Sequence, residues 1–185
     1  MKYCIKHCES EIIKGNGMSS NIIYEISDDN QYRYALGLKG NNPLYCFGIN
    51  PNTATPEDYD LTMKKLRKVA QLFGFNSYVM LNIYPLRTSS PKDLPETINY
   101  KEHTKNVKII LEKIINGTSI WAAWGDSINV RPWLNTCLAN IIENIEKKKK
   151  NINWLKMGDL TNALNPRHPS RLKYQEFTQL KLLSH

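Results

Sequence analysis

The sequence has few cysteines and no long run of apolar residues. Four cysteines in 185 residues are too few for the dense disulfide framework of a small secreted scaffold. No apolar stretch approaches the roughly 20 residues of a membrane-spanning helix, and the N-terminus has no signal-peptide core. We therefore expect one domain over residues 1–185, in the cytoplasm and without contact to a membrane.

Residues that ligate metal ions are also scarce. Cys4, His7 and Cys8 lie close together, but no second pair of ligands follows with the spacing of a zinc site. All four cysteines, Cys4, Cys8, Cys46 and Cys137, are expected as free thiols. We expect neither a metal ion nor an organic cofactor.

Acidic residues are outnumbered by basic ones, 17 against 25, which gives a formal net charge of +8 and a pI near 9.3. This balance favours a polyanionic partner, of which nucleic acid is the most obvious. A basic surface without such a partner is the alternative. The run of lysines at 147–150 follows a helical pattern, where it is typical of a helix C-terminal end.

Short apolar runs alternate with helical patterns along most of the chain. Residues 44–49, 78–83, 119–124 and 153–157 have the pattern of buried strands. Helices are predicted over 61–73, with a start signal at 56–58, and over 101–115 and 133–145. This alternation predicts an α/β fold with three layers, α/β/α, around a short, mainly parallel central sheet.

The N-terminal part has a different pattern. Residues 22–26 and 32–38 alternate between apolar and polar side chains, and an Asp-Asp-Asn turn separates them. This arrangement predicts an antiparallel hairpin. We expect a peripheral region over residues 1–42 and a core over residues 43–174.

Polar residues stand where the predicted strands end. Asn50 and Asn82 each follow a buried apolar run, and His168 lies in the loop after the last run. Because ligands of open α/β sheets bind beyond the carboxyl ends of the strands, we expect these three side chains to line one pocket. The proline-punctuated segment 84–99 is expected to be an ordered loop that shapes it.

Three segments resemble signature motifs of the uracil-DNA glycosylase superfamily: Gly48-Ile49-Asn50-Pro51, Leu81-Asn82 and His168-Pro169-Ser170-Arg171-Leu172. The first is closest to the GINPG motif of the mismatch-specific branch. Trp121-Ala122-Ala123-Trp124-Gly125 is similar to the strand ending in WG that precedes the last motif. The resemblance covers most of residues 44–172 in the family's order and implies a glycosylase-like fold.

The resemblance also implies roles for these residues. Asn50 would position the attacking water, Asn82 would bind the edge of a flipped base, and His168 would support the departing base. Leu172 would fill the gap in the duplex. Tyr59 is the nearest counterpart of the aromatic residue that stacks on the base, although its register differs.

DNA contacts are expected around this pocket. Arg87, Arg167 and Arg171 are suited to bind phosphates, and Ser170 lies in the same motif. Two positions depart from the family: Asn50 replaces the Asp of its fastest members and has no basic group, and Arg171 replaces a proline. We expect Trp121 and Trp124 in the core.

A second resemblance is to an uncharacterised bacterial and phage domain family with the motifs NPSTA, DPT, NLFALRAT, AAWG and PRHP. The corresponding segments here read NPNTA, DLT, NIYPLRTS, AAWG and PRHP in the same order. No activity can be carried over from this resemblance. It is compatible with a divergent branch of glycosylases.

These observations favour a monofunctional DNA glycosylase, a monomer without an obligatory protein partner, that acts on double-stranded DNA with a flipped base. Residues 52–55 are small, which favours a pyrimidine with a bulky or hydroxylated 5-substituent, as in the modified DNA of some phages. The protein would then be an antiviral enzyme. The alternatives are a nucleoside or nucleotide N-glycosidase and a non-catalytic module that binds modified bases. The base, the strand preference and the oligomeric state stay open.

Overall fold

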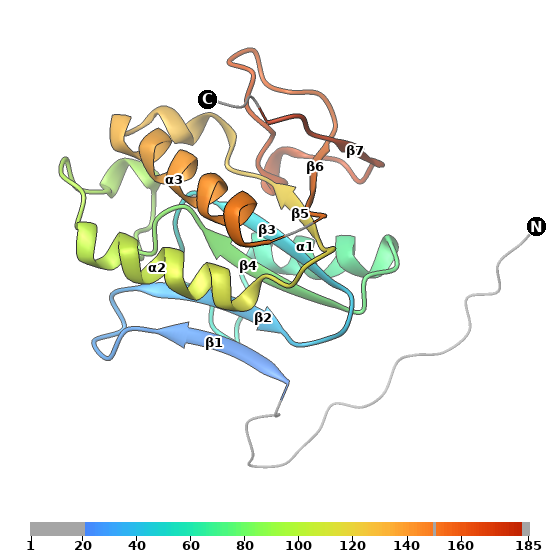
Figure 1. Cartoon of the computed structure of the whole chain (residues 1–185), viewed down its shortest axis with the longest axis horizontal. Helices are drawn as coiled ribbons and strands as arrows, with labels where there is room; N and C mark the ends of the chain where they lie inside the picture. The colour runs from blue at the N-terminus through green and yellow to red at the C-terminus, as the bar shows by residue number, and fades with distance from the viewer. Residues whose placement is uncertain (1–20, 150, 183–185) are drawn as a thin grey trace, which may run out of the picture.

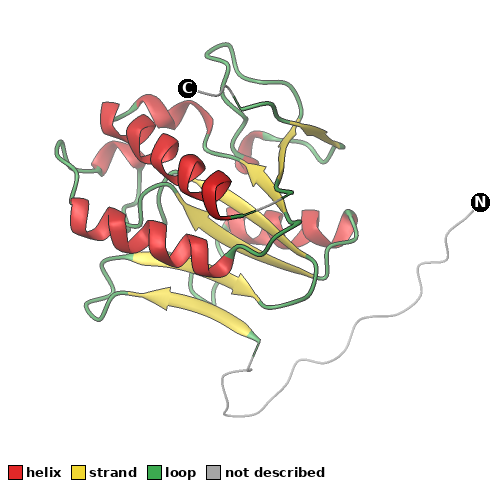
Figure 2. Cartoon of the chain, in the orientation of Figure 1, coloured by secondary structure: helices red, strands yellow, loops and turns green. Residues whose placement is uncertain are grey.

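The computed structural model describes residues 21–149 and 151–182. Cys4, His7 and Cys8 lie outside these residues. The fold is a mixed α/β fold, with one twisted sheet and helices on both of its faces (Figures 1 and 2). Within the described residues, no helix is long and apolar enough to cross a membrane.

The sheet has seven strands in the order β1-β2-β4-β3-β5-β6-β7. The strands are β1 (Ile22–Ile26), β2 (Arg33–Leu38), β3 (Pro43–Gly48), β4 (Ser77–Asn82), β5 (Ser119–Ala122), β6 (Asn153–Met157) and β7 (Phe177–Gln179). The four central strands, β4, β3, β5 and β6, run parallel to one another. The three outer pairings, β1 with β2, β2 with β4 and β6 with β7, are antiparallel.

The prediction of an α/β fold is confirmed, but the prediction of a short, mainly parallel sheet was wrong. Half of the six strand pairings are antiparallel, because strands have been added at both edges of the parallel centre. The N-terminal hairpin, expected to be peripheral, is part of the sheet. Its second strand pairs with β4, and Tyr34, Ala35 and Leu36 are fully buried.

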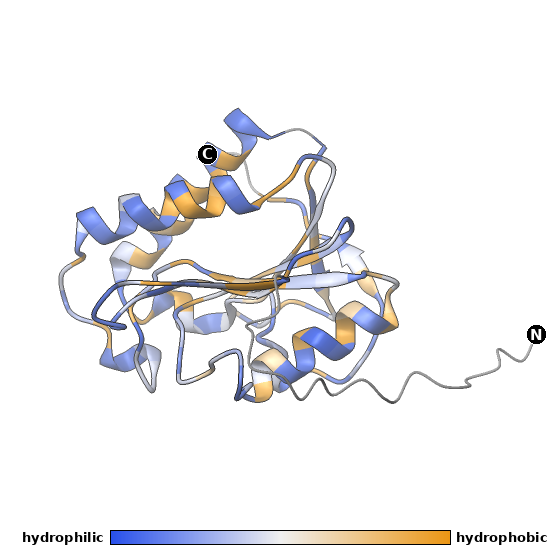
Figure 3. Ribbon diagram, turned by 90° about the horizontal axis from the view of Figure 1, so that it is seen from below, coloured by the Kyte–Doolittle hydropathy of each residue, from blue (hydrophilic) through white to orange (hydrophobic). Residues whose placement is uncertain are grey.

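The helices are α1 (Leu61–Leu72), α2 (Tyr100–Lys113) and α3 (Pro132–Lys148). Figure 3 shows the sheet nearly edge-on, with helices above and below it. Side chains of β3 alternate between the faces: Leu44 and Cys46 pack with the apolar side of α1. Tyr45 and Phe47 face the cluster that contains Ile110 of α2 and Ile141 of α3. This alternation is the two-residue period of a strand buried on both faces.

Helix α1 confirms the predicted range 61–73, but it begins after the expected start signal at 56–58. Its N-cap is Asp60, whose Oδ1 accepts the backbone N–H of Met63 at 2.8 Å, so the predicted start at 56–58 was wrong. Gly74, with φ +77°, follows the last turn, as expected for a helix end. The position of this N-cap matters because it places a carboxylate beside the cavity described below.

Candidate functional site

A cavity of about 300 Å³ opens at the carboxyl edge of the parallel strands, and Asn50, Asn82 and His168 all line it. Asn82 is the last residue of β4, Asn50 follows β3, and His168 lies in the loop after β6. The predicted convergence of these three residues on one pocket is therefore confirmed. A volume of this size accommodates a nucleobase or another small ligand.

Asn82 lies at the floor of the cavity, with only 2% of the residue exposed. Its Nδ2 atom is buried and has no hydrogen-bond partner in the described part of the chain. Gly48, its neighbour in the parallel register, leaves the room for this amide, since a Cβ at position 48 would lie 3.2 Å from Asn82 Oδ1. Because buried polar groups in proteins are normally paired, this donor is suited to an acceptor on a ligand or to a water molecule.

The side-chain amide of Asn50 is held in one orientation. Its Nδ2 atom donates to the carbonyl oxygens of Pro51 (3.1 Å) and Leu86 (3.3 Å) and to the hydroxyl of Thr88 (2.7 Å). Since carbonyl oxygens only accept, this end of the amide must be the nitrogen. Asn50 Oδ1 is therefore the atom left to accept a hydrogen bond, such as that of a water molecule.

His168 is oriented just as firmly. Its Nδ1 atom accepts the backbone N–H of Ser170 at 3.3 Å and lies 2.9 Å from the Ser170 hydroxyl. A nitrogen that accepts carries no proton in the neutral ring, so the proton of neutral His168 is on Nε2. Burial lowers the pKa of His168 below its ordinary value of 6.5; nearby Asp60 raises it, and Arg171 and Lys65 lower it further. At neutral pH this side chain is thus an uncharged donor through Nε2.

The backbone conformation at position 125 requires a glycine after Trp124. The φ of Gly125 is +62°, a conformation that favours glycine, and its N–H donates to Pro166 O at 2.9 Å. A Cβ at position 125 would lie 3.3 Å from the Cβ of His168. The close approach of the two loops therefore places His168 at the cavity, and Trp124 itself lines the wall.

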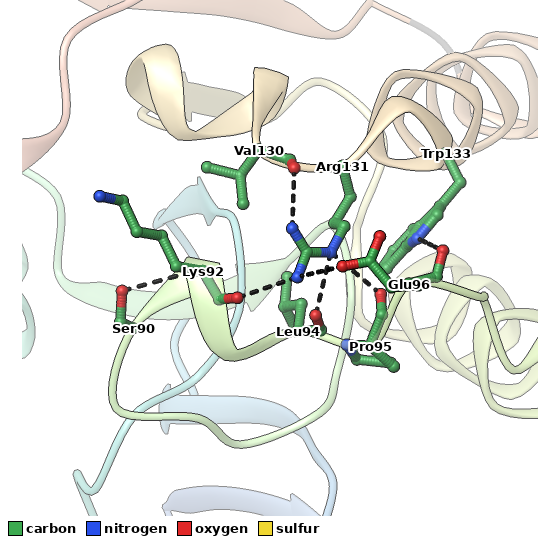
Figure 4. Close-up of polar contacts among 8 residues, drawn as sticks. All are labelled: Ser90, Lys92, Leu94, Pro95, Glu96, Val130, Arg131 and Trp133. Carbon is green, nitrogen blue, oxygen red and sulfur yellow. Dashed lines mark hydrogen bonds and ion pairs between the residues drawn. The ribbon is translucent and has the colours of Figure 1, made fainter.

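The loop over residues 84–99 forms another wall, to which Thr88, Ser89 and Pro91 contribute. Arg131, at the start of α3, fixes this loop from behind (Figure 4). Its guanidinium donates to the carbonyl oxygens of Lys92, Leu94 and Pro95 at 3.0–3.2 Å and lies 3.1 Å from a carboxylate oxygen of Glu96. Trp133 adds a hydrogen bond from Nε1 to Glu96 O at 3.1 Å. The expectation of an ordered loop that shapes the pocket is confirmed.

Two charged residues of the cavity were missed by the sequence analysis. Arg33 begins β2, and because β2 is antiparallel to β4, its first residue lies at the same edge as the last residue of β4. Asp60, the N-cap of α1, is the one carboxylate among the residues that line the cavity. A charged residue at the start of an alternating strand and the Asp of the segment Asp60-Leu61-Thr62 were visible in the sequence. Without knowledge of the strand order, however, neither Arg33 nor Asp60 could be assigned to the pocket.

Several predicted site residues lie elsewhere. Tyr59 does not line the cavity; its hydroxyl accepts from Tyr78 at 3.3 Å beside the apolar side of α1. Arg87 donates to Asn52 O (3.0 Å) and to the Tyr24 hydroxyl (2.6 Å), and Arg167 to Asp159 O (3.0 Å) and Leu160 O (3.4 Å). These two arginines hold loops together, so their predicted role as free phosphate ligands is not supported. Arg171 and Ser170 are exposed and do line the cavity.

Leu172 is 7% exposed and packs in the apolar cluster beneath α1. The turn η3 (Pro169–Arg171) directs it inward, and its carbonyl oxygen accepts from the Lys65 ammonium. It is therefore not a protruding wedge in this conformation.

Leu164, four residues before His168, is 76% exposed and has a φ of +61°. Asp126 holds that loop, because its Oδ1 accepts from Thr161 (2.5 Å) and Asn165 (2.9 Å).

Within the described residues, no group of three or more His, Cys, Asp or Glu side chains could hold a metal ion. Cys46 and Cys137 are buried free thiols. Burial raises the pKa of the Cys137 thiol to about 12 and also raises that of Cys46. Both side chains therefore stay protonated and act as apolar core residues.

Residues 33–170 match the DUF1643 family, which is described as a protein of unknown function. The match covers most of the chain, so the protein belongs to the DUF1643 family. No curated protein and no solved structure matches the chain. Apart from Arg171, every residue that lines the cavity lies within the matched segment.

Proposed function

We propose that this protein is a monofunctional DNA glycosylase that flips a modified pyrimidine into the cavity and hydrolyses its N-glycosidic bond. The observation that carries this proposal is the opposite polarity of two fixed groups in one cavity. Asn50 has an acceptor left to hold a water molecule, and His168 has a donor left on Nε2. We also propose that helices on both faces of the parallel centre correspond to the three-layer arrangement of uracil-DNA glycosylases.

The chemistry follows from where charge develops. As the bond between the sugar and the base breaks, positive charge grows on the sugar and negative charge on the departing base. A neutral His168 with its proton on Nε2 is a preorganised donor for that anion. The free Nδ2 of Asn82 is suited to an acceptor on the base. Water then forms the new bond to the sugar, and the base leaves as the free pyrimidine after it has gained a proton.

Asp60 supplies the basic group that Asn50 lacks. An amide cannot take a proton from water, whereas the Asp60 carboxylate is a base and also lines the cavity. One of its oxygens caps α1, and Oδ2 has no hydrogen bond among the described residues. We assign to Asp60 the acceptance of the proton from the attacking water or the electrostatic stabilisation of the sugar cation.

The surface around the cavity supports binding to a DNA backbone. Arg171 and Ser170 are exposed at the rim. Lys64, Arg67 and Lys68 lie outside the cavity, on the exposed side of α1, and add positive charge to the protein surface. Leu164 replaces Leu172 as the candidate wedge, since it is a large apolar side chain exposed on a loop with left-handed backbone. Strain and exposure of this kind are concentrated at functional loops. Removal of bases from hypermodified phage DNA is the biological role that we propose.

The test is the formation of abasic sites, detected as strand cleavage after alkali. The substrates are unmodified DNA, uracil-containing DNA and phage DNA with hydroxymethylated or glycosylated cytosine. We expect cleavage of the modified DNA and none with His168→Ala. Asp60→Asn is the matched variant, because Asn caps a helix as well as Asp does, so loss of activity would reflect the carboxylate rather than the fold.

The two alternatives give different outcomes. A non-catalytic module, which Asn50 in place of Asp favours, would bind modified DNA without forming abasic sites. A nucleoside N-glycosidase would release a free base from nucleosides and leave DNA intact. Strong cleavage of uracil-containing DNA with none of modified DNA would contradict the proposed substrate.

A further inference from the structure

Arg33 is a buried cation without a counter-ion. It is 2% exposed, and its Nη1 donates to Ala54 O at 2.7 Å. Its Nε is buried and has no hydrogen-bond partner, and no ion pair of Arg33 exists among the described residues. Charged side chains are almost never buried to this degree unless they are paired.

The charge on Arg33 persists at neutral pH. Burial lowers the pKa of its guanidinium to about 10, and the nearby Arg87 lowers it as well, while Asp60 and Tyr24 raise it. Asp60 is not within ion-pair distance, and its Oδ1 is committed to the N–H of Met63. The cavity therefore contains a buried positive charge that has no ion-pair partner among the described residues, with the Asp60 carboxylate in the same lining but beyond ion-pair distance.

We propose that the cavity takes a ligand with an anionic oxygen group and that Arg33 is the counter-ion of that group. This inference rests on the proposed function for the orientation of the ligand. A backbone phosphate would stay at the rim, where Arg171 and Ser170 are exposed. Arg33, which is 2% exposed and lines the cavity, instead meets the part of the ligand inside the cavity, so the base itself would carry the anionic substituent.

Arg33 and Asn82 act on the same part of the ligand. The register of β2 and β4 pairs Ala35 with Leu81, so continuing it brings the start of β2 beside the end of β4. A guanidinium and a free amide donor that line the same cavity suit a carboxylate or another group with two oxygens. Asn82 alone would suit a neutral carbonyl oxygen. The inference that the ligand is an anion therefore rests on the positive charge of Arg33.

Binding of small ligands tests this inference without any turnover. The first arm compares cytosine with 5-carboxycytosine by NMR titration, and the second compares deoxycytidine with deoxycytidine 5′-monophosphate. For the wild-type protein we expect 5-carboxycytosine to bind about ten- to a hundredfold more tightly than cytosine, the range for a charge-assisted hydrogen bond. The second arm should show a preference of less than about threefold.

Variants test whether Arg33 is responsible for the preference for 5-carboxycytosine over cytosine. Arg33→Gln should abolish the preference for 5-carboxycytosine, and Arg33→Lys should retain part of it. Lys108→Gln, on the exposed side of α2 and outside the cavity lining, should leave it unchanged. The wild-type comparison holds even if a variant fails to fold. No preference in either arm, or one that survives in Arg33→Gln, would overturn the proposal.

A preference in the monophosphate arm alone would overturn the assignment of the anion to the base, and would indicate a free nucleotide as ligand. Failure of the glycosylase proposal is recognised separately. In that case no abasic sites form on any DNA, whatever the two binding arms give.

Discussion

The hydroxyl of Thr88 lies 2.7 Å from Asn50 Nδ2 and, on its other side, 2.7 Å from the carbonyl oxygen of Ser90. Its single proton goes to Ser90, so Thr88 can only accept from Asn50. The loop thus dictates an amide at position 50. An aspartate there, as in the fastest members of the glycosylase superfamily, would have no proton to give.

We therefore predict that Asn50→Asp destabilises the protein and does not raise its activity. The carboxylate would face two carbonyl oxygens and a committed hydroxyl, which costs about 1–3 kcal/mol for unpaired buried acceptors. Chemical denaturation of both proteins would measure the difference. An unchanged free energy of unfolding together with faster base excision would contradict this account of the site.

Gly125→Ala should lower the free energy of unfolding and displace His168. A positive φ costs a residue with a Cβ about 1–2 kcal/mol, and here the new methyl group would also lie 3.3 Å from His168 Cβ. Gly117→Ala is the control, because Gly117 has a φ of +73° and open space around it. Equal losses for the two variants would mean that Gly125 has no role in placing His168.

Activity should decline in acid only below pH 6.5. The pKa of His168 is lowered from 6.5 by burial, so the neutral donor persists to a lower pH than for a free imidazole. Stability should also decrease towards acid pH, since burial lowers the pKa of His103 as well as that of His168. The unfolded chain then binds more protons than the native one, and the free energy of unfolding decreases as pH falls below about 6.5.

The measurement is the pH dependence of single-turnover excision, beside denaturation curves at the same pH values. A half-maximal rate at or above pH 6.5 would contradict the assigned state of His168. His168→Ala should leave no activity whose pH profile could be followed, but its stability should depend less on pH than that of the wild type.

Leu164→Ala should weaken productive binding to duplex DNA and leave stability almost unchanged. The side chain is 76% exposed, so little packing is lost, while a wedge that supports a flipped base would be missing. Leu72→Ala, 53% exposed at the far end of α1, is the matched control. Equal excision rates for the two variants would remove Leu164 from the proposed interface.

The sequence was sufficient for the part of the site built on parallel strands. Asn50 and Asn82 follow short buried strands, and the rule that such strands end at a common edge placed them together correctly. Arg33 could not be found in this way. Its position depends on an antiparallel strand that pairs with β4, and the hairpin sequence contains nothing that specifies this partner.

Leu172 and Tyr59 illustrate a second limit. Both were assigned by motif register, which fixes the order of residues along the chain but not the direction of a side chain. The three-residue turn η3 sends Leu172 into the apolar cluster beneath α1, and Tyr59 contacts Tyr78. Packing against α1 decides both orientations, and packing is a property of the assembled fold.

The cavity draws on Arg33 near the beginning of the described chain and on Arg171 near its end. Bringing two residues so distant in sequence to one cavity closes a long loop and requires nearly all of the described chain. A chain that is still incomplete or only partly folded therefore lacks one side of the binding site.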